Sequence, residues 1–186
     1  MGSFYTSATV RGVRTTDVIR AMRGRHAFVA AIGDDVAVFD ADCERQDPRA
    51  QTALGAHLSQ VLHRPVLSVL NHDDSVLQLR LHQDGTCVLE YDSSPGYFSG
   101  ADLPPSRVDA NVLCDALGAT DAAARVGEIL NADDDAFVFA SERHEALHVA
   151  LGLPTPAVGY GFTYLASGDL PPGLDSSDLV EVGGSV

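Results

Sequence analysis

Two alternating segments near the middle of the chain constrain its fold more than any other feature. Leucines occupy every second position from Leu77 to Leu81, and after the turn signal Asp84-Gly85 the alternation resumes and runs to Tyr91. Alternation with period two on both sides of a short Asp-Gly turn is typical of a half-exposed β-hairpin with one apolar and one polar face. The chain is therefore expected to contain an antiparallel sheet, and another layer must cover its apolar face.

The elements predicted before this hairpin follow the order strand, helix, hairpin, helix, strand. The second helix has the clearest start, because Asp47 can cap it and Pro48 fits its first position. This order is the β-α-β-β-α-β sequence of a ferredoxin-like fold, whose helices pack on one face of an antiparallel-rich sheet. The predicted elements cover residues 4–11, 16–24, 26–39, 47–64 and 66–70.

The part of the chain after the hairpin is predicted to be mainly helical. A loop rich in Ser, Pro and Gly leads into it, and Ser141 is predicted to cap its last helix. We therefore expect a single α+β domain over residues 1–170 and a flexible tail over residues 171–186. The loop, three helices and a final strand are predicted at residues 92–105, 109–117, 121–130, 141–151 and 159–165.

The charge of the chain is strongly one-sided. Twenty-six carboxylates face twelve arginines and no lysine, for a formal net charge of −14. Such a surface repels phosphate backbones and anionic lipid headgroups, so we expect neither nucleic-acid nor membrane binding. A basic protein partner fits this charge better. The composition is typical of a bacterial protein, and because no secretory leader or membrane span is visible, we expect it in the cytoplasm.

The run His144-Glu145-Ala146-Leu147-His148 matches the zincin motif. On a helix, His144 and His148 share one face and can both bind zinc, while Glu145 activates a water as a base. A catalytic zinc needs a third protein ligand, however, and no histidine follows His148. The other interpretation is an ordinary amphipathic helix that packs Leu147 and Leu151 inward and keeps both histidines at its solvent margin.

The loop at residues 91–98 contains two aromatic residues beside proline and glycine. Aromatic side chains in such a loop anchor it either on the protein's own surface or on a partner. The neighbouring serines lack the Gly-x-Ser-x-Gly context of a nucleophile. The candidate binding residues of this loop are Tyr91, Asp92, Ser93, Tyr97 and Phe98.

Several of these segments together resemble a group of uncharacterised bacterial proteins of similar length. The resemblance is carried by residues 1–6, the turn at residues 70–74, the loop at residues 91–98 and the run at residues 142–147, followed by Gly152-Leu153-Pro154. That group has no established activity, so the resemblance implies no catalytic residue. A histidine at the position of His148 is not a fixed feature of the group, which favours a coincidental zincin match.

Two functions of different classes follow from the sequence. The favoured one is a non-catalytic protein-interaction or regulatory domain of the immunity-like kind, which needs no cofactor and binds a basic partner electrostatically. The alternative is a small zinc hydrolase that uses His144, Glu145 and His148. A ligand-binding sensor that uses a cleft beside residues 91–98 is a third, weaker hypothesis. Whether the protein is an enzyme stays open at this point, with the balance against it.

Overall fold

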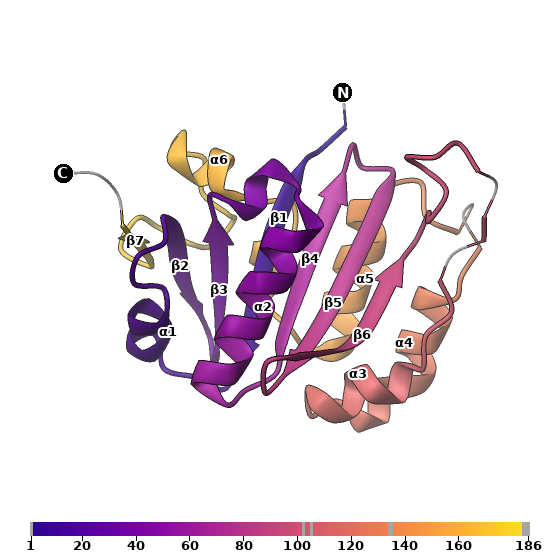
Figure 1. Ribbon diagram of the computed structural model, residues 1–186, viewed down its shortest axis with the longest axis horizontal. Coiled ribbons are helices and arrows are strands. Elements are labelled where there is room, and N and C mark those ends of the chain that lie inside the picture. Colours follow the sequence, from indigo (N-terminus) through magenta and orange to yellow (C-terminus); the bar gives the residue numbers. More distant parts are fainter. Residues whose placement is uncertain (1, 102, 105, 134–135, 184–186) are drawn as a thin grey trace.

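The structure, a computed structural model, describes residues 2–101, 103–104, 106–133 and 136–183 and contains one antiparallel sheet. Within these residues, seven strands pair in the order β6-β5-β4-β1-β3-β2-β7 (Figure 1). The expected combination of helices with an antiparallel sheet is confirmed. The strands are β1 (Tyr5–Arg11), β2 (Ala27–Ile32), β3 (Asp35–Asp40), β4 (Val66–His72), β5 (Val76–Gln83), β6 (Thr86–Asp92) and β7 (Leu179–Val182).

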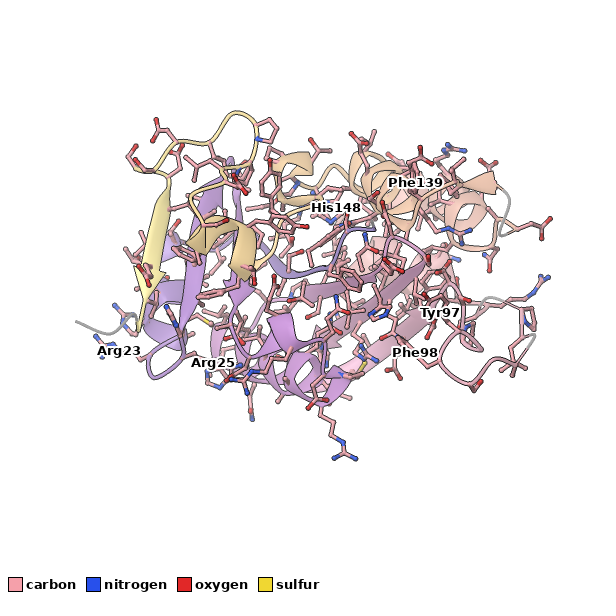
Figure 2. The ribbon with its side chains drawn as sticks, turned by 90° about the horizontal axis from the view of Figure 1, so that it is seen from above. Arg23, Arg25, Tyr97, Phe98, Phe139 and His148 are labelled. Carbon is pink, nitrogen blue, oxygen red and sulfur yellow. The ribbon has the colours of Figure 1, made fainter. Side chains whose placement is uncertain are left out.

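Helices cover both faces of the sheet. In Figure 2 the violet helix and the orange and yellow helices lie on opposite sides of the strands. On one face lie α1 (Thr15–Ala21) and α2 (Pro48–Leu62), and on the other lie α3 (Ala110–Ala116), α4 (Ala123–Leu130), α5 (Ala140–Leu151) and α6 (Phe162–Ala166). Short 3₁₀ helices are η1 (Cys43–Arg45), η2 (Thr120–Ala122) and η4 (Thr155–Ala157). Among the described residues, no helix combines the length and the apolar character needed to cross a membrane.

The first four strands lie side by side in the order β4-β1-β3-β2, and α1 and α2 pack on their common face. The predicted start of α2 is confirmed, because the Asp47 side chain accepts a hydrogen bond from the Arg49 amide at 2.9 Å and Pro48 takes the first helical position. Leu54 and Leu58 of α2 enter the core of this face. The helix thus crosses the sheet with its apolar side inward.

The polar side of β5 is buried, so the prediction of a half-exposed hairpin is wrong for this strand. Helix α2 crosses β5 and covers Arg80 and His82, which are 7% and 0% exposed. The Arg80 guanidinium pairs with Glu90 of β6 at 2.7 Å, and its Nη1 donates to Gln51 Oε1 of α2 at 2.6 Å, so both its charge and a buried donor have partners. Gly55 permits the close approach, since a β-carbon there would lie 2.4 Å from the His82 ring. A polar strand face is therefore an interior surface here.

The C-terminal segment differs from the predicted final strand. Residues 159–165 do not form a strand: they contain α6, preceded by Gly159 with a positive φ of 85° and by Gly161 at its N-cap. The added strand is β7 (Leu179–Val182), which pairs with β2 from within the segment predicted to be a flexible tail. Gly159 and Gly161, just before α6, interrupt an extended conformation there. The edge of β2 pairs instead with β7, which lies further along the chain.

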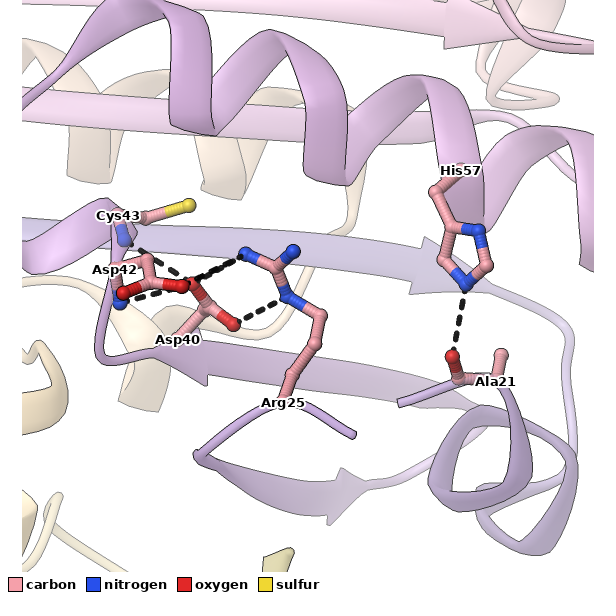
Figure 3. A network of polar contacts seen from close by, with 6 residues as sticks. All are labelled: Ala21, Arg25, Asp40, Asp42, Cys43 and His57. Atoms are coloured by element: carbon pink, nitrogen blue, oxygen red, sulfur yellow. Dashed lines mark hydrogen bonds and ion pairs between the residues drawn. The ribbon is translucent and has the colours of Figure 1, made fainter. Parts of the chain in front are cut away.

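A buried ion pair joins the two ends of the β2–β3 hairpin (Figure 3). The Arg25 guanidinium contacts both carboxylate oxygens of Asp40, at 2.7 and 2.8 Å, and Asp40 is 2% exposed. Asp40 also accepts from the amides of Asp42 and Cys43. Burial by itself would raise the pKa of Asp40, but the hydrogen bonds and charge of Arg25 outweigh it, and the pKa is lowered. The pair fixes the entry to η1.

Candidate functional site

Helix α5 turns both histidines of the zincin motif toward the sheet. His144 and His148 are 0% exposed, so the expectation that they lie at the solvent margin is wrong. They face the central strand β1, which places the phenol of Tyr5 against His144 with the two rings stacked. Leu147 and Leu151 flank them in the core, as predicted. Two polar rings on the inward side of the helix are matched here by a polar side chain on the strand.

The buried histidines form a directional chain of hydrogen bonds. His148 Nδ1 lies 2.9 Å from the carbonyl oxygen of Pro154, which only accepts, so this nitrogen carries the proton. The neutral His148 therefore accepts at Nε2 from the Nε2–H of His144, across 3.0 Å. His144 then accepts at Nδ1 from the hydroxyl of Tyr5, across 2.9 Å. All four ring nitrogens are satisfied by one arrangement of protons.

Burial keeps this chain uncharged. It lowers the pKa of His144 well below its ordinary value, and the neighbouring His148 adds to that effect. Burial likewise lowers the pKa of His148 to about 4, and it raises the pKa of Tyr5. Neutral imidazoles and a neutral phenol are therefore the forms present near pH 7.

Glu145 lies away from the two histidines, on the outer side of α5. It is exposed and lines a groove of about 310 Å³ with residues of η4 and the C-terminal segment. Among the described residues, no group of three or more His, Cys, Asp and Glu side chains is placed to hold a metal ion. A zinc ion bound by His144 and His148 would have to replace their mutual hydrogen bond. The structure thus separates the base of the motif from its two metal ligands.

The N-terminus of α5 is capped by residues other than Ser141, so that predicted cap is wrong. Asp74, in the turn between β4 and β5, accepts from the Ala140 amide through its carbonyl and from the Ser141 amide through its carboxylate, at 2.8 and 2.9 Å. Glu142 accepts from the amide of Phe139 at 3.2 Å. A side chain far away in the sequence thus does what a local Ser does in many helices, and it ties α5 to the sheet.

The loop at residues 91–98 divides into an inner and an outer part. Tyr91 is 1% exposed and its hydroxyl accepts from Arg143, and the Ser93 hydroxyl accepts from the Leu77 amide at 2.9 Å. Asp92 accepts from Gln78 across the sheet at 2.8 Å. These three candidate residues hold the loop on β5 and α5, which is a structural task whatever else they do.

The outer part of the loop belongs to an exposed aromatic cluster. We use the name aromatic cluster for Phe4, His72, Tyr97 and Phe98, whose rings meet edge to face. His72 lies at its centre, 5.0 Å from the Phe4 ring and 4.8 Å from the Phe98 ring. Phe98 is 67% exposed, and Phe4 and Tyr97 are each exposed by about two fifths. The cluster joins the start of β1, the end of β4 and the loop after β6.

A second exposed apolar pair lies across a polar cavity from this loop. Val138 and Phe139, just before α5, are 78% and 50% exposed. With Ser93, Ser94 and Asp74 they line a cavity of about 260 Å³. Figure 2 shows Tyr97, Phe98 and Phe139 at the same end of the molecule. Exposed aromatic side chains gathered at one end are typical of a surface that binds another molecule.

The charge of the chain is distributed unevenly between its parts. Residues 1–64 contain seven carboxylates and eight arginines, whereas residues 93–186 contain fourteen carboxylates and three arginines. We use the name acidic layer for this second segment, which forms α3 to α6 and β7. Of its arginines, Arg125 pairs with Glu128 and Arg143 is only 3% exposed. Among the described residues, the excess negative charge therefore lies mainly in the segments that form the face of α3 to α6 and in β7.

Sequence reasoning did not connect Phe4, His72, Val138 and Phe139 with the 91–98 loop, because nothing in the local sequence brings them there. The uneven charge was visible in the sequence and could have been found by counting segment by segment. Comparison with protein families, curated proteins and solved structures finds no match to this chain. The candidate site therefore has to be interpreted from its own geometry.

Proposed function

We propose that this protein is a non-catalytic interaction domain, of the immunity-like or regulatory kind, that binds a basic protein partner. The observation that carries the proposal is the exposed aromatic cluster, of which Tyr97 and Phe98 belong to the acidic layer, where carboxylates greatly outnumber arginines. Aromatic side chains are enriched at protein interfaces and among the few residues that dominate their binding free energy, and complementary charge supplies orientation and association rate. We expect this activity in the cytoplasm of a bacterium.

The buried histidine chain supports a non-catalytic function. A hydrolytic centre needs its nucleophile, base and electrophile open to substrate, whereas His144 and His148 are fully buried and hydrogen-bonded within the core. Their observed contacts stabilise the packing of α5 on β1. We also propose a ferredoxin-like start to the fold, supported by the strand order β4-β1-β3-β2 with α1 and α2 on one face.

Selection of peptides on the folded protein tests the interaction. A random peptide library displayed on phage is enriched on wild type and, in parallel, on Phe98→Ala. We expect wild type to enrich peptides rich in arginine and lysine, with binding that weakens as salt is raised, and Phe98→Ala to lose most of this enrichment. Peptides without an excess of basic residues, or an equal yield on both proteins, would contradict the proposal.

The zinc hydrolase keeps one supporting observation, the two Nε2 atoms that face each other 3.0 Å apart on one side of α5. Metal analysis of the purified protein, with His148→Ala as its control, decides it. One zinc per chain that disappears in His148→Ala would favour the hydrolase over the interaction domain. Less than one zinc per chain, or zinc retained by the variant, ends this alternative.

A further inference from the structure

A groove on the outer side of α5 has the chemistry of a site for a basic side chain. Its volume is about 310 Å³, at the small end of the range of about 300–1,000 Å³ that ligand pockets span. That size suits one long side chain rather than a large ligand. The residues that line the groove are Glu145, Thr155, Pro156, Val158, Tyr160 and Pro172.

Glu145 provides the only charge among the described residues that line this groove. Its carboxylate makes no hydrogen bond or ion pair with any other residue whose structure is described, so folding does not use it. Its position is nevertheless fixed, because the opposite side of the same helix carries the buried pair His144 and His148. A carboxylate on a rigid helix, free of an internal partner, is ready to accept hydrogen bonds from a cation.

The walls of the groove suit the rest of a basic side chain. Tyr160 contributes an aromatic ring, which attracts a guanidinium or ammonium group and also packs against a methylene stem. Pro156, Val158 and Pro172 add apolar surface of fixed shape. The groove also lies within the acidic layer, whose net negative charge raises the local concentration of cations.

We propose that an arginine side chain of a basic protein partner enters this groove, with its guanidinium on the Glu145 carboxylate and its stem along Tyr160 and the prolines. This inference rests on the proposed function, since it names one anchor of the same partner. Arginine is favoured over lysine because its planar group donates two parallel hydrogen bonds to a carboxylate and stacks on aromatic rings.

Nuclear magnetic resonance titration with N-acetyl-arginine amide tests the groove directly. We expect amide shifts in residues 155–160 and around Glu145, and none with the neutral citrulline counterpart. Glu145→Gln should weaken the binding about tenfold, the effect of losing one charge-assisted contact. Glu128→Gln is the matched control: it removes the same charge from an exposed position on α4, where Glu128 already pairs with Arg125.

Two results would overturn the inference. One is the absence of shifts in residues 155–160, and the other is an equal loss of binding in Glu145→Gln and Glu128→Gln, which would show general attraction to the acidic layer. Phe98→Ala separates this test from that of the proposed function. It should keep arginine binding in the groove while losing the selected peptides, so a failure of the groove can be distinguished from a failure of the proposed function.

Discussion

The two faces of the sheet differ in how they hold buried polar and charged groups. On the face of α1 and α2, charged side chains are used inside the protein: Arg25 pairs with Asp40, and Arg80 reaches Gln51 beneath α2. On the face of α3 to α6, the polar interior is the neutral chain of Tyr5, His144 and His148. One buried guanidinium, that of Arg143, lies there too, and it is held by the Tyr91 hydroxyl and by backbone carbonyls instead of by a carboxylate. Charges that folding uses are held by ion pairs or by hydrogen bonds, and charges left without such contacts at the surface are available to a partner.

The largest change in the free energy of unfolding should come from protonation of the buried, neutral histidines at low pH. Because the folded pKa values of His144 and His148 are depressed, the unfolded chain binds more protons below about pH 6.5. The stability that these residues contribute is complete above that pH and is lost as the pH falls toward 4. From pH 7 to pH 5 we expect the free energy of unfolding to drop by about 3–4 kcal/mol, near 1.4 kcal/mol per pH unit per histidine.

Urea denaturation at a series of pH values measures this drop. His63→Gln is the control. Because the side chain of His63 is 82% exposed, its replacement should leave the change of unfolding free energy with pH nearly as in wild type. Nitrogen-15 shifts of the imidazoles at pH 7 provide an independent check, since they should show a protonated Nε2 in His144 and a protonated Nδ1 in His148. A free energy of unfolding that does not change between pH 7 and pH 5 would contradict the contrast between the neutral buried chain on this face and the buried ion pair on the other.

On the other face, the buried ion pair of Arg25 and Asp40 should lose stability when its carboxylate is neutralised. Asp40→Asn leaves the Arg25 guanidinium in place without its counter-ion, and removing one member of a buried pair costs about 3 kcal/mol. Denaturant unfolding measures the loss. Asp17→Asn is the comparison, because Asp17 also pairs with arginines but in solvent, and its removal should cost far less. Equal losses would mean that burial of the pair is unimportant.

A smaller effect should follow from shortening the neutral chain. Tyr5→Phe keeps the ring that stacks on His144 but removes the hydroxyl that donates to its Nδ1. A buried acceptor without a donor costs about 1–2 kcal/mol of unfolding free energy. Thermal or urea unfolding checks this against Tyr97→Phe, whose ring is 41% exposed and which should match wild type.

The same contrast explains how far sequence alone could go. Alternation located β5 and β6, and Asp47-Pro48 located α2, because those signals are local. The burial of Arg80 and His82 was missed, since it depends on α2 crossing a strand that lies later in the chain. The cap of α5 by Asp74 and the pairing of β7 with β2 are also long-range, and no local pattern reports them.

For the candidate site, residue type was predictable and environment was not. The sequence placed His144, Glu145 and His148 on one helix, but only packing decides which side of that helix meets the sheet. Tyr97 and Phe98 stood out by composition, whereas Phe4 and His72 join them through the ends of β1 and β4. Chemistry carried by one element can be predicted, and chemistry assembled from several elements needs the fold.

The smallest predicted effect tests whether surface carboxylates on the two faces contribute to stability with opposite signs. Asp115 lies in the last turn of α3 within the acidic layer, where it opposes the helix dipole and makes no ion pair with a described residue. Asp115→Asn should therefore raise the free energy of unfolding by about 0.3–0.5 kcal/mol. Asp17→Asn should lower it, because Asp17 lies in the first turn of α1 between Arg14 and Arg20. Changes of opposite sign in the unfolding free energy of the two variants, measured by matched urea titrations, would show that the acidic layer retains carboxylates at a cost to stability, as expected of a binding surface. A loss of stability in both variants would contradict this difference between the two faces.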